Sequence, residues 1–171
     1  MRERGAAWLL AGFVALTIFA ATRTTLWDRD EARFGEAAGE MAANGNFLFP
    51  TFNGALRADK PILPYWVMAA GIGLLGRGAL GVRIGSCLAA AAAAWAAAAT
   101  ARRLLPAGAA FWAVAMLVSS PLFLLEASAG TADAVLVAAI AAAMLGFARL
   151  IQERRLWPGA VLFGGASAAA A

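Results

Sequence analysis

Long apolar stretches, separated by short charged groups, occupy most of this 171-residue chain and constrain its fold more than any other feature. Hydrophobic residues make up 63% of the sequence and charged residues only 14%, with a mean hydropathy of +0.74. Soluble domains contain roughly 45–50% apolar residues. In a bilayer, backbone polar groups must find their partners within the protein, which favours helices. The sequence therefore predicts an all-α membrane protein.

Six apolar segments are expected to form helices in the membrane or at its surface. They cover residues 6–22, 62–76, 82–101, 108–125, 134–150 and 156–171. The first follows Arg2 and Arg4, and we expect an uncleaved membrane helix there, with a cleaved signal peptide as the alternative. The last segment has 16 residues, whereas crossing the hydrocarbon core takes about 20. We therefore expect the chain to be a truncated piece of a longer protein.

The arginine groups indicate which segments cross the membrane. Arg102–Arg103 and Arg149–Arg155 each follow an apolar segment, and such groups tend to lie in the cytoplasm. If the N-terminus is inside and segment 62–76 does not cross, both arginine groups lie in the cytoplasm. We prefer this arrangement, and a helix over 62–76 would span only about 22 Å of the roughly 30 Å core. Tyr65 and Trp66 suit such an interfacial or re-entrant helix. If every segment crosses instead, both arginine groups lie outside.

Charge is concentrated in the loop that follows the first apolar segment. Residues 25–66 hold six of the ten acidic residues and the only lysine, Lys60. The chain has no histidine and a single cysteine, Cys87, so acid, base or metal chemistry must come from carboxylates. The remaining basic residues lie beside apolar runs, as topology-setting charge does, which gives little support to a nucleic-acid partner.

The first half of this loop is predicted to form a surface helix. Asp28 and Glu31 have the spacing of a capping box, and Asn44–Gly45 is a stop signal. On this helix Glu36 and Glu40 are interpreted as surface charges, either solvated or paired. The apolar face is expected to lie against the membrane surface, and it consists of Phe34, Ala37, Ala38 and Met41.

The second half of the loop predicts extended chain and then a new helix. A turn is expected at Asn53–Gly54, and Pro61 is typical of a first helical turn. Three ionisable residues remain open to two interpretations. Asp30 is either a site residue or an N-cap, and Lys60 either binds an anion or extends to the interface as a membrane anchor. Asp133, at the mouth of an apolar segment, is a site candidate or lies in the first turn of a helix that Thr131 caps.

Carboxylates and a lysine at one membrane face suit group transfer from a phosphate-linked lipid. A carboxylate can deprotonate an acceptor hydroxyl or help to hold a divalent cation, and a lysine can neutralise a phosphate. One alternative is a small transporter or channel subunit in which Asp133 binds an ion. Another is a structural membrane protein with a capped surface helix.

The sequence closely resembles the N-terminal part of the ArnT/PMT-type glycosyltransferases of the GT-C superfamily, which include lipid A aminoarabinose transferases and protein O-mannosyltransferases. Three stretches carry the resemblance: "DRDEARFGEAAGEMAANGNFLFPTFNGALRADKPILPYW", "RIGSCLAAAAAAWAAAATARRLLP" and "SSPLFLLEASAGTADAVL". It implies a GT-C-type transmembrane helix bundle with juxtamembrane helices in an outer loop. It further implies a multi-pass enzyme of the bacterial inner membrane. Such an enzyme takes a sugar from a polyprenyl-phosphate donor to a lipid, glycan or protein acceptor at the outer face.

The resemblance also implies roles for five residues. Asp30 and Asp133 match the family's acidic residues in the first and second outer loops and are predicted to be catalytic. Lys60 and Arg33 are predicted to bind the donor phosphate, and Asp59 to help hold a divalent metal ion. Asp59 stands where the family more often has glutamate, and Ile62 replaces a second proline.

Overall fold

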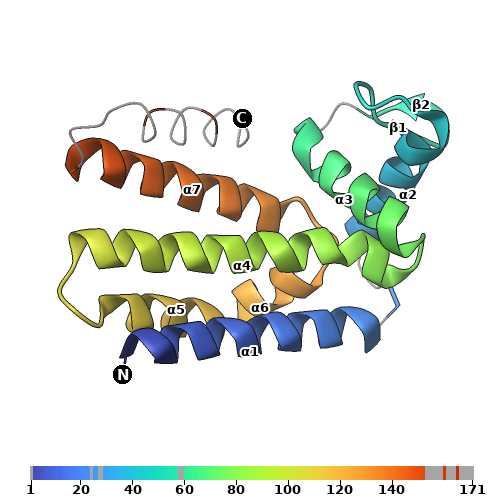
Figure 1. Cartoon of the computed structure of the whole chain (residues 1–171). Coiled ribbons are helices and arrows are strands. Elements are labelled where there is room, and N and C mark those ends of the chain that lie inside the picture. Colours follow the sequence, from blue (N-terminus) through green and yellow to red (C-terminus); the bar gives the residue numbers. More distant parts are fainter. Residues whose placement is uncertain are drawn as a thin grey trace.

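The computed structural model describes residues 2–23, 25–26, 29–57, 60–152, 160 and 165. Its described part is predominantly helical, which confirms the all-α prediction. Three helices are long and apolar enough to cross a membrane: α1 (Arg2–Arg23), α4 (Ala79–Leu104) and α7 (Asp133–Gln152). They run side by side as the body of the molecule (Figure 1). The predicted last segment, 156–171, lies outside the described residues except for positions 160 and 165.

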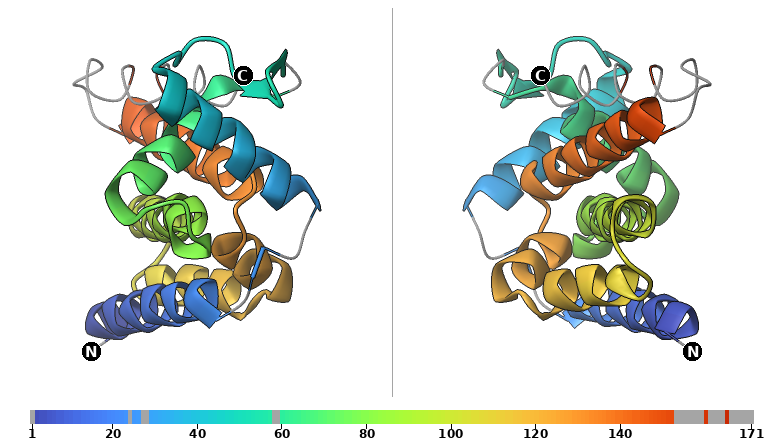
Figure 2. Two further views of the ribbon diagram at one scale, coloured as in Figure 1. Left: turned by 90° about the vertical axis from the view of Figure 1, so that its right-hand side faces the viewer. Right: turned by 90° about the vertical axis from the view of Figure 1, so that its left-hand side faces the viewer.

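Helix α4 lies at the centre of the bundle. In end-on view α7 packs on one side of it, and α1 with α5 (Ala109–Ser119) on the other (Figure 2). Small residues form much of the contact, which allows the helix backbones to approach closely in lipid. The two core clusters of this region are Ala6, Ala98, Ala110 and Val114, and Phe13, Ala90 and Ala127.

Segment 108–125, predicted as one helix, forms two helices instead. Helix α5 ends at Ser119, α6 (Pro121–Ser128) follows, and the two are bent by 71°. Pro121 has no backbone N–H, and its ring would clash with the carbonyl one turn earlier in a continuous helix. The Ser120 side chain caps the new helix by accepting from the Phe123 backbone N–H at 3.5 Å. Proline and serine together therefore break this segment.

The charged loop folds into a compact unit at one end of the bundle (Figure 1). It contains α2 (Arg29–Asn44), a hairpin of β1 (Thr51–Phe52) and β2 (Ala55–Leu56), and then α3 (Ile62–Leu75). The hairpin turn lies at the predicted position, with positive φ angles at Asn53 and Gly54. Helix α1 ends and α7 begins at this same end of the bundle.

The apolar face of α2 packs against α3 and not against the membrane surface, so that expectation was wrong. Phe34, Ala37, Ala38 and Met41 share one buried cluster with residues of α3, namely Tyr65, Met68, Ala69 and Ile72. Tyr65, expected at the interface, is fully buried, and its hydroxyl accepts a hydrogen bond from Arg57 Nε at 3.1 Å. Trp66 remains partly exposed, and its indole N–H donates to the Phe47 carbonyl at 2.6 Å.

Glycines bring α3 and α4 into direct backbone contact. A Cβ on Gly71 would lie 2.3 Å from the Gly81 carbonyl oxygen, and one on Gly85 would lie 2.2 Å from Val67 Cγ1. Side chains at these positions would push the two helices apart. The close approach fixes α3, and with it Lys60 immediately before it, against the bundle.

Candidate functional site

Asp30 and Arg33 lie one turn apart near the start of α2. Arg33 Nη1 is 3.9 Å from Asp30 Oδ1, and the two side chains are 57% (Asp30) and 40% (Arg33) exposed. Because both side chains are exposed, both groups are accessible to a substrate. An ion pair exposed to this degree contributes little to stability. Asp30 lies inside α2, which begins at Arg29, and it is therefore not the N-cap. An acidic residue in the first helical turn is favoured by the helix dipole.

Lys60 and Asp133 line the same cavity, although they lie far apart in the sequence. Its volume is about 120 Å³, and Pro61, Pro64 and Leu136 form part of its apolar wall. Lys60 precedes α3, and Asp133 is the first residue of α7. An ammonium, a carboxylate and the first turn of α3 thus surround a small space. Free backbone N–H groups at a helix start favour an anion.

Asp133 also lines a second, larger cavity between α4, α5, α6 and α7. Its volume is about 470 Å³, and most of its wall is apolar, with Ser120 and Glu126 as the other polar side chains. The Thr131 hydroxyl donates to Glu126 Oε2 at 2.6 Å. This bond uses the hydroxyl as a donor, whereas capping α7 would use it as an acceptor. Asp133 does lie in the first turn of α7, as the capping alternative assumed.

A buried ion pair, which the sequence pattern did not predict, links these elements. Glu31, interpreted as a capping residue, is fully buried and accepts from Arg83 Nε at 2.5 Å and Arg83 Nη2 at 2.8 Å. Its Oε1 atom also accepts from the Gly130 backbone N–H at 2.7 Å. The available signal was Arg83 itself, because an arginine inside an apolar helix is costly and requires a partner.

The two surface glutamates of α2 differ in the structure. Glu36 is exposed, whereas Glu40 is partly buried and accepts from the Thr51 hydroxyl and from the Gly54 backbone N–H. The hydrogen bond from Thr51 is the main reason that the pKa of Glu40 lies below its ordinary value. Partial desolvation raises this pKa, whereas the backbone N–H groups of Gly54 and Asn53 and the charge of Arg77 lower it further. Glu40 therefore fixes the hairpin to α2.

The predicted metal ligand, Asp59, lies outside the described residues. Within the described part of the chain, no group of three or more acidic or cysteine side chains is placed to hold a metal ion. Metal binding by Asp59 stays a prediction.

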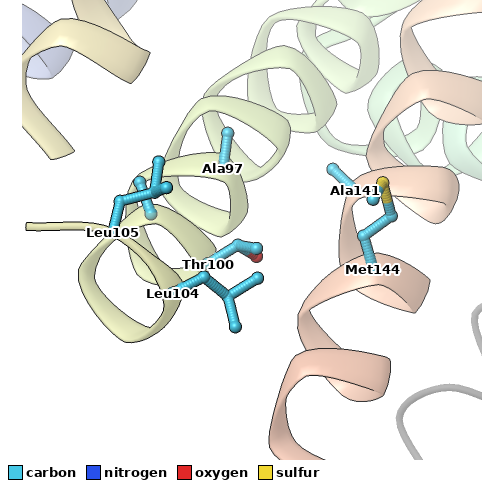
Figure 3. Close-up of a pocket in the computed structure, with 7 residues that line it drawn as sticks. Ala97, Thr100, Leu104, Leu105, Ala141 and Met144 are labelled. Atoms are coloured by element: carbon cyan, nitrogen blue, oxygen red, sulfur yellow. The ribbon is translucent and has the colours of Figure 1, made fainter. Parts of the chain in front are cut away.

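Another cavity, of about 330 Å³, opens between α4 and α7 near the opposite end of the bundle (Figure 3). Ala97, Leu104, Leu105, Ala141 and Met144 give it an apolar wall. Thr100 also lines the cavity, and its hydroxyl donates to the Ala96 carbonyl within α4 at 2.9 Å. The cavity lacks the charged groups that group transfer requires, so the candidate site is the end formed by α2, α3 and the start of α7.

Comparisons with known proteins agree on one group of enzymes. The family model described as Dolichyl-phosphate-mannose-protein mannosyltransferase matches residues 59–170. The chain is 36% identical over 96 residues to the undecaprenyl phosphate-alpha-4-amino-4-deoxy-L-arabinose arabinosyl transferase 1 of Pseudomonas fluorescens (strain Pf0-1). This match covers 56% of the chain but only 17% of that relative.

Two crystal structures of ArnT from Cupriavidus metallidurans share the fold. The structure bound to undecaprenyl phosphate matches with a TM-score of 0.86 and 22% identity, over 96% of this chain and 31% of that protein. The apo structure matches with a TM-score of 0.77 and 23% identity, over 96% of this chain and 30% of that protein. The chain thus spans less than a third of each of these proteins and has the arrangement of that part.

Proposed function

The chain belongs to the dolichyl-phosphate-mannose-protein mannosyltransferase family, and on that premise we propose that it forms the N-terminal part of a polyprenyl-phosphate-dependent glycosyltransferase. The observation that carries the proposal is the cavity shared by Lys60 and Asp133 at the start of α3, the helix on which α2 with Asp30 packs. The family assignment favours this function over a transporter or channel subunit with Asp133 as an ion site.

The donor is a sugar linked to a polyprenyl phosphate, and undecaprenyl phosphate is the carrier that the relatives support. The curated relative is named for an undecaprenyl-phosphate-linked aminoarabinose, and one ArnT structure holds undecaprenyl phosphate. Lys60 binds the donor phosphate as a compact positive charge at the start of α3, and Arg33 is the second cation that we assign to it. The enzyme is a multi-pass protein of the bacterial inner membrane, and its site faces the outside.

In the reaction, the bond between the sugar C1 atom and the phosphate oxygen breaks, and a bond from C1 to the acceptor oxygen forms. The acceptor loses a proton, which Asp30 takes as general base. Lys60 and Arg33 stabilise the charge that develops on the leaving polyprenyl phosphate. Asp133, which lines the same small cavity as Lys60, orients the sugar or the acceptor hydroxyl. The acceptor is a lipid, a glycan or a protein.

A divalent metal ion held through Asp59 would supply further charge neutralisation at the phosphate. Asp59 lies outside the described residues, so the roles of Asp30, Lys60, Arg33 and Asp133 are assigned without it.

The test uses the full-length protein in proteoliposomes, with a panel of undecaprenyl-phosphate sugars. Asp30→Asn keeps the shape of the side chain but removes its charge and basicity, so turnover should fall by about 100-fold or more. Glu36→Gln is the matched control, because Glu36 lies exposed on the same helix. Equal losses in both variants, or full activity in Asp30→Asn, would contradict the assignment.

A further inference from the structure

The buried carboxylate of Glu31 joins two parts of the chain that carry candidate site residues. Glu31 follows Asp30 on α2, and its Oε1 atom accepts the Gly130 backbone N–H at 2.7 Å. Gly130 lies in the loop that leads directly into Asp133. One carboxylate oxygen therefore connects the helix of Asp30 with the loop that positions Asp133.

Arg83 holds this carboxylate in a fixed orientation. Its Nε and Nη2 atoms donate to the two oxygens of Glu31, and both side chains are fully buried. Two further guanidinium protons reach the end of α1 and the following loop, where Arg83 Nη1 donates to the Ala21 carbonyl at 3.2 Å and Nη2 to the Thr25 carbonyl at 2.9 Å. A planar guanidinium that binds both carboxylate oxygens allows little rotation of either group. The pair thus acts as a rigid bracket between α1, α2 and α4.

The loop at Gly130 fits closely against this bracket. A Cβ at position 130 would lie 2.6 Å from Val82 Cγ1 and 3.2 Å from Glu31 Oε1. The next residue of the loop is held from α4 as well, because the Ser86 hydroxyl donates to the Thr131 carbonyl at 3.5 Å. The approach of this loop to α2 therefore depends on glycine at position 130 and on the orientation of Glu31.

Burial of an ion pair is weak evidence for stability, since the desolvation of two charges offsets most of their attraction. Its geometry is the more informative feature here. We propose that Glu31 is a positioning residue, whose carboxylate, held by Arg83 and bonded to Gly130, sets the placement of Asp30 relative to Asp133. The inference rests on the function proposed above.

Kinetics of the full-length enzyme test this role, with all rates normalised to folded, monodisperse protein. Glu31→Gln keeps the side-chain volume but loses the charge and one acceptor oxygen. Misplacement of reacting groups should lower kcat about tenfold or more, while the KM for the donor changes less than about threefold, because Lys60 is untouched. Gly130→Ala, which retains the ion pair, should have the same effect, and Glu36→Gln should have none.

A second variant separates the bracket from simple fold stabilisation. Glu31→Arg with Arg83→Glu restores an ion pair but places a guanidinium donor against the Gly130 N–H, itself a donor. We expect recovery of folded protein without recovery of kcat. Full recovery of kcat would show that only the ion pair matters and would overturn the proposal.

A distance measurement supplies a readout that does not depend on activity. Spin labels at exposed positions of α2 and α7, Ala32→Cys and Ile140→Cys in a Cys87→Ala background, report the separation of the two helices. Glu31→Gln and Gly130→Ala should shift or broaden the distance distribution. Unchanged distances with unchanged kcat, or loss of folded protein in every variant, would overturn the proposal. A different outcome would refute only the proposed function. In that outcome the wild type has no transferase activity, but Glu31→Gln and Gly130→Ala still change the distance between the spin labels.

Discussion

Lys60 and Asp133 face one cavity of about 120 Å³, although one precedes α3 and the other begins α7. The close packing of α3 on α4 and of α4 on α7 brings the two residues together. An ammonium and a carboxylate share this space with the start of α3, and the donor proposed for this site would present a phosphate to the ammonium and hydroxyl groups to the carboxylate. A glycosyl phosphate carries both.

We predict that Lys60 binds the donor phosphate and does not serve as a membrane anchor. Lys60→Ala should weaken donor binding by about 1.5–3 kcal/mol, the contribution of one charged hydrogen bond. Lys60→Arg should restore binding only partly, because a planar guanidinium does not reproduce a compact ammonium. The measurement is the Kd for undecaprenyl phosphate in the full-length protein at matched expression. A membrane anchor needs only charge and length, so unchanged binding in both variants would support that alternative.

The arrangement of the helices predicts which positions share a side of the membrane. Asp133 should react from outside intact cells after Asp133→Cys substitution, as should Lys60→Cys, whereas Arg102→Cys should react only after permeabilisation. The reason is that α4 and α7 both begin at the end of the bundle that carries α2 and α3 and run in the same direction, so the end of α4 lies away from the start of α7 (Figure 1). The background is Cys87→Ala, which removes a buried thiol. Labelling of position 133 only after permeabilisation would reverse the proposed orientation.

The packing of α3 on α4 should depend on Gly71 but not on Gly73. Gly71→Ala would place a Cβ 2.3 Å from the Gly81 carbonyl oxygen, and we expect a loss of about 1–3 kcal/mol through overpacking. Gly73→Ala on the same helix meets no described atom within 4 Å, and alanine favours helix by about 1 kcal/mol over glycine. Thermal unfolding in detergent should therefore give a lower Tm for the first variant and an equal or higher Tm for the second. Equal destabilisation by both would show that the contact is not specific.

The hairpin at residues 51–56 should weaken in acid. The pKa of Glu40 is lowered in the folded protein, chiefly by the Thr51 hydroxyl, so ionised Glu40 stabilises the hairpin above its unfolded pKa of about 4.3. This contribution is lost as the pH falls through the lower folded pKa. Hydrogen-exchange protection of the Gly54 amide, corrected for the intrinsic rate, should fall over this range. Glu40→Gln should show weaker protection at neutral pH with little change in acid, and Glu36→Gln should behave as the wild type.

The class of the protein and most of its helices follow from the amino-acid sequence without any knowledge of the packing. Apolar length and the cost of unpaired backbone groups in lipid require helices at α1, α4 and α7, whatever surrounds them. The turn at Asn53–Gly54 also follows from local preferences, because these residues tolerate positive φ. Asp30, Lys60 and Asp133 could be selected as candidates because charge is rare in such a chain.

Which side chains meet, in contrast, depends on the packing of the helices against one another. The apolar face of α2 had two possible partners, the membrane surface and α3, and periodicity does not distinguish between them. Likewise, the sequence contains Glu31 and Arg83 but not their contact, which forms because folding brings Arg83, near the start of α4, to Glu31, near the start of α2, and buries both charges. The cavity between Lys60 and Asp133 depends in the same way on how the helices pack. Local sequence fixes backbone conformation, whereas the burial of charge and the approach of distant residues follow from the packing of the whole chain.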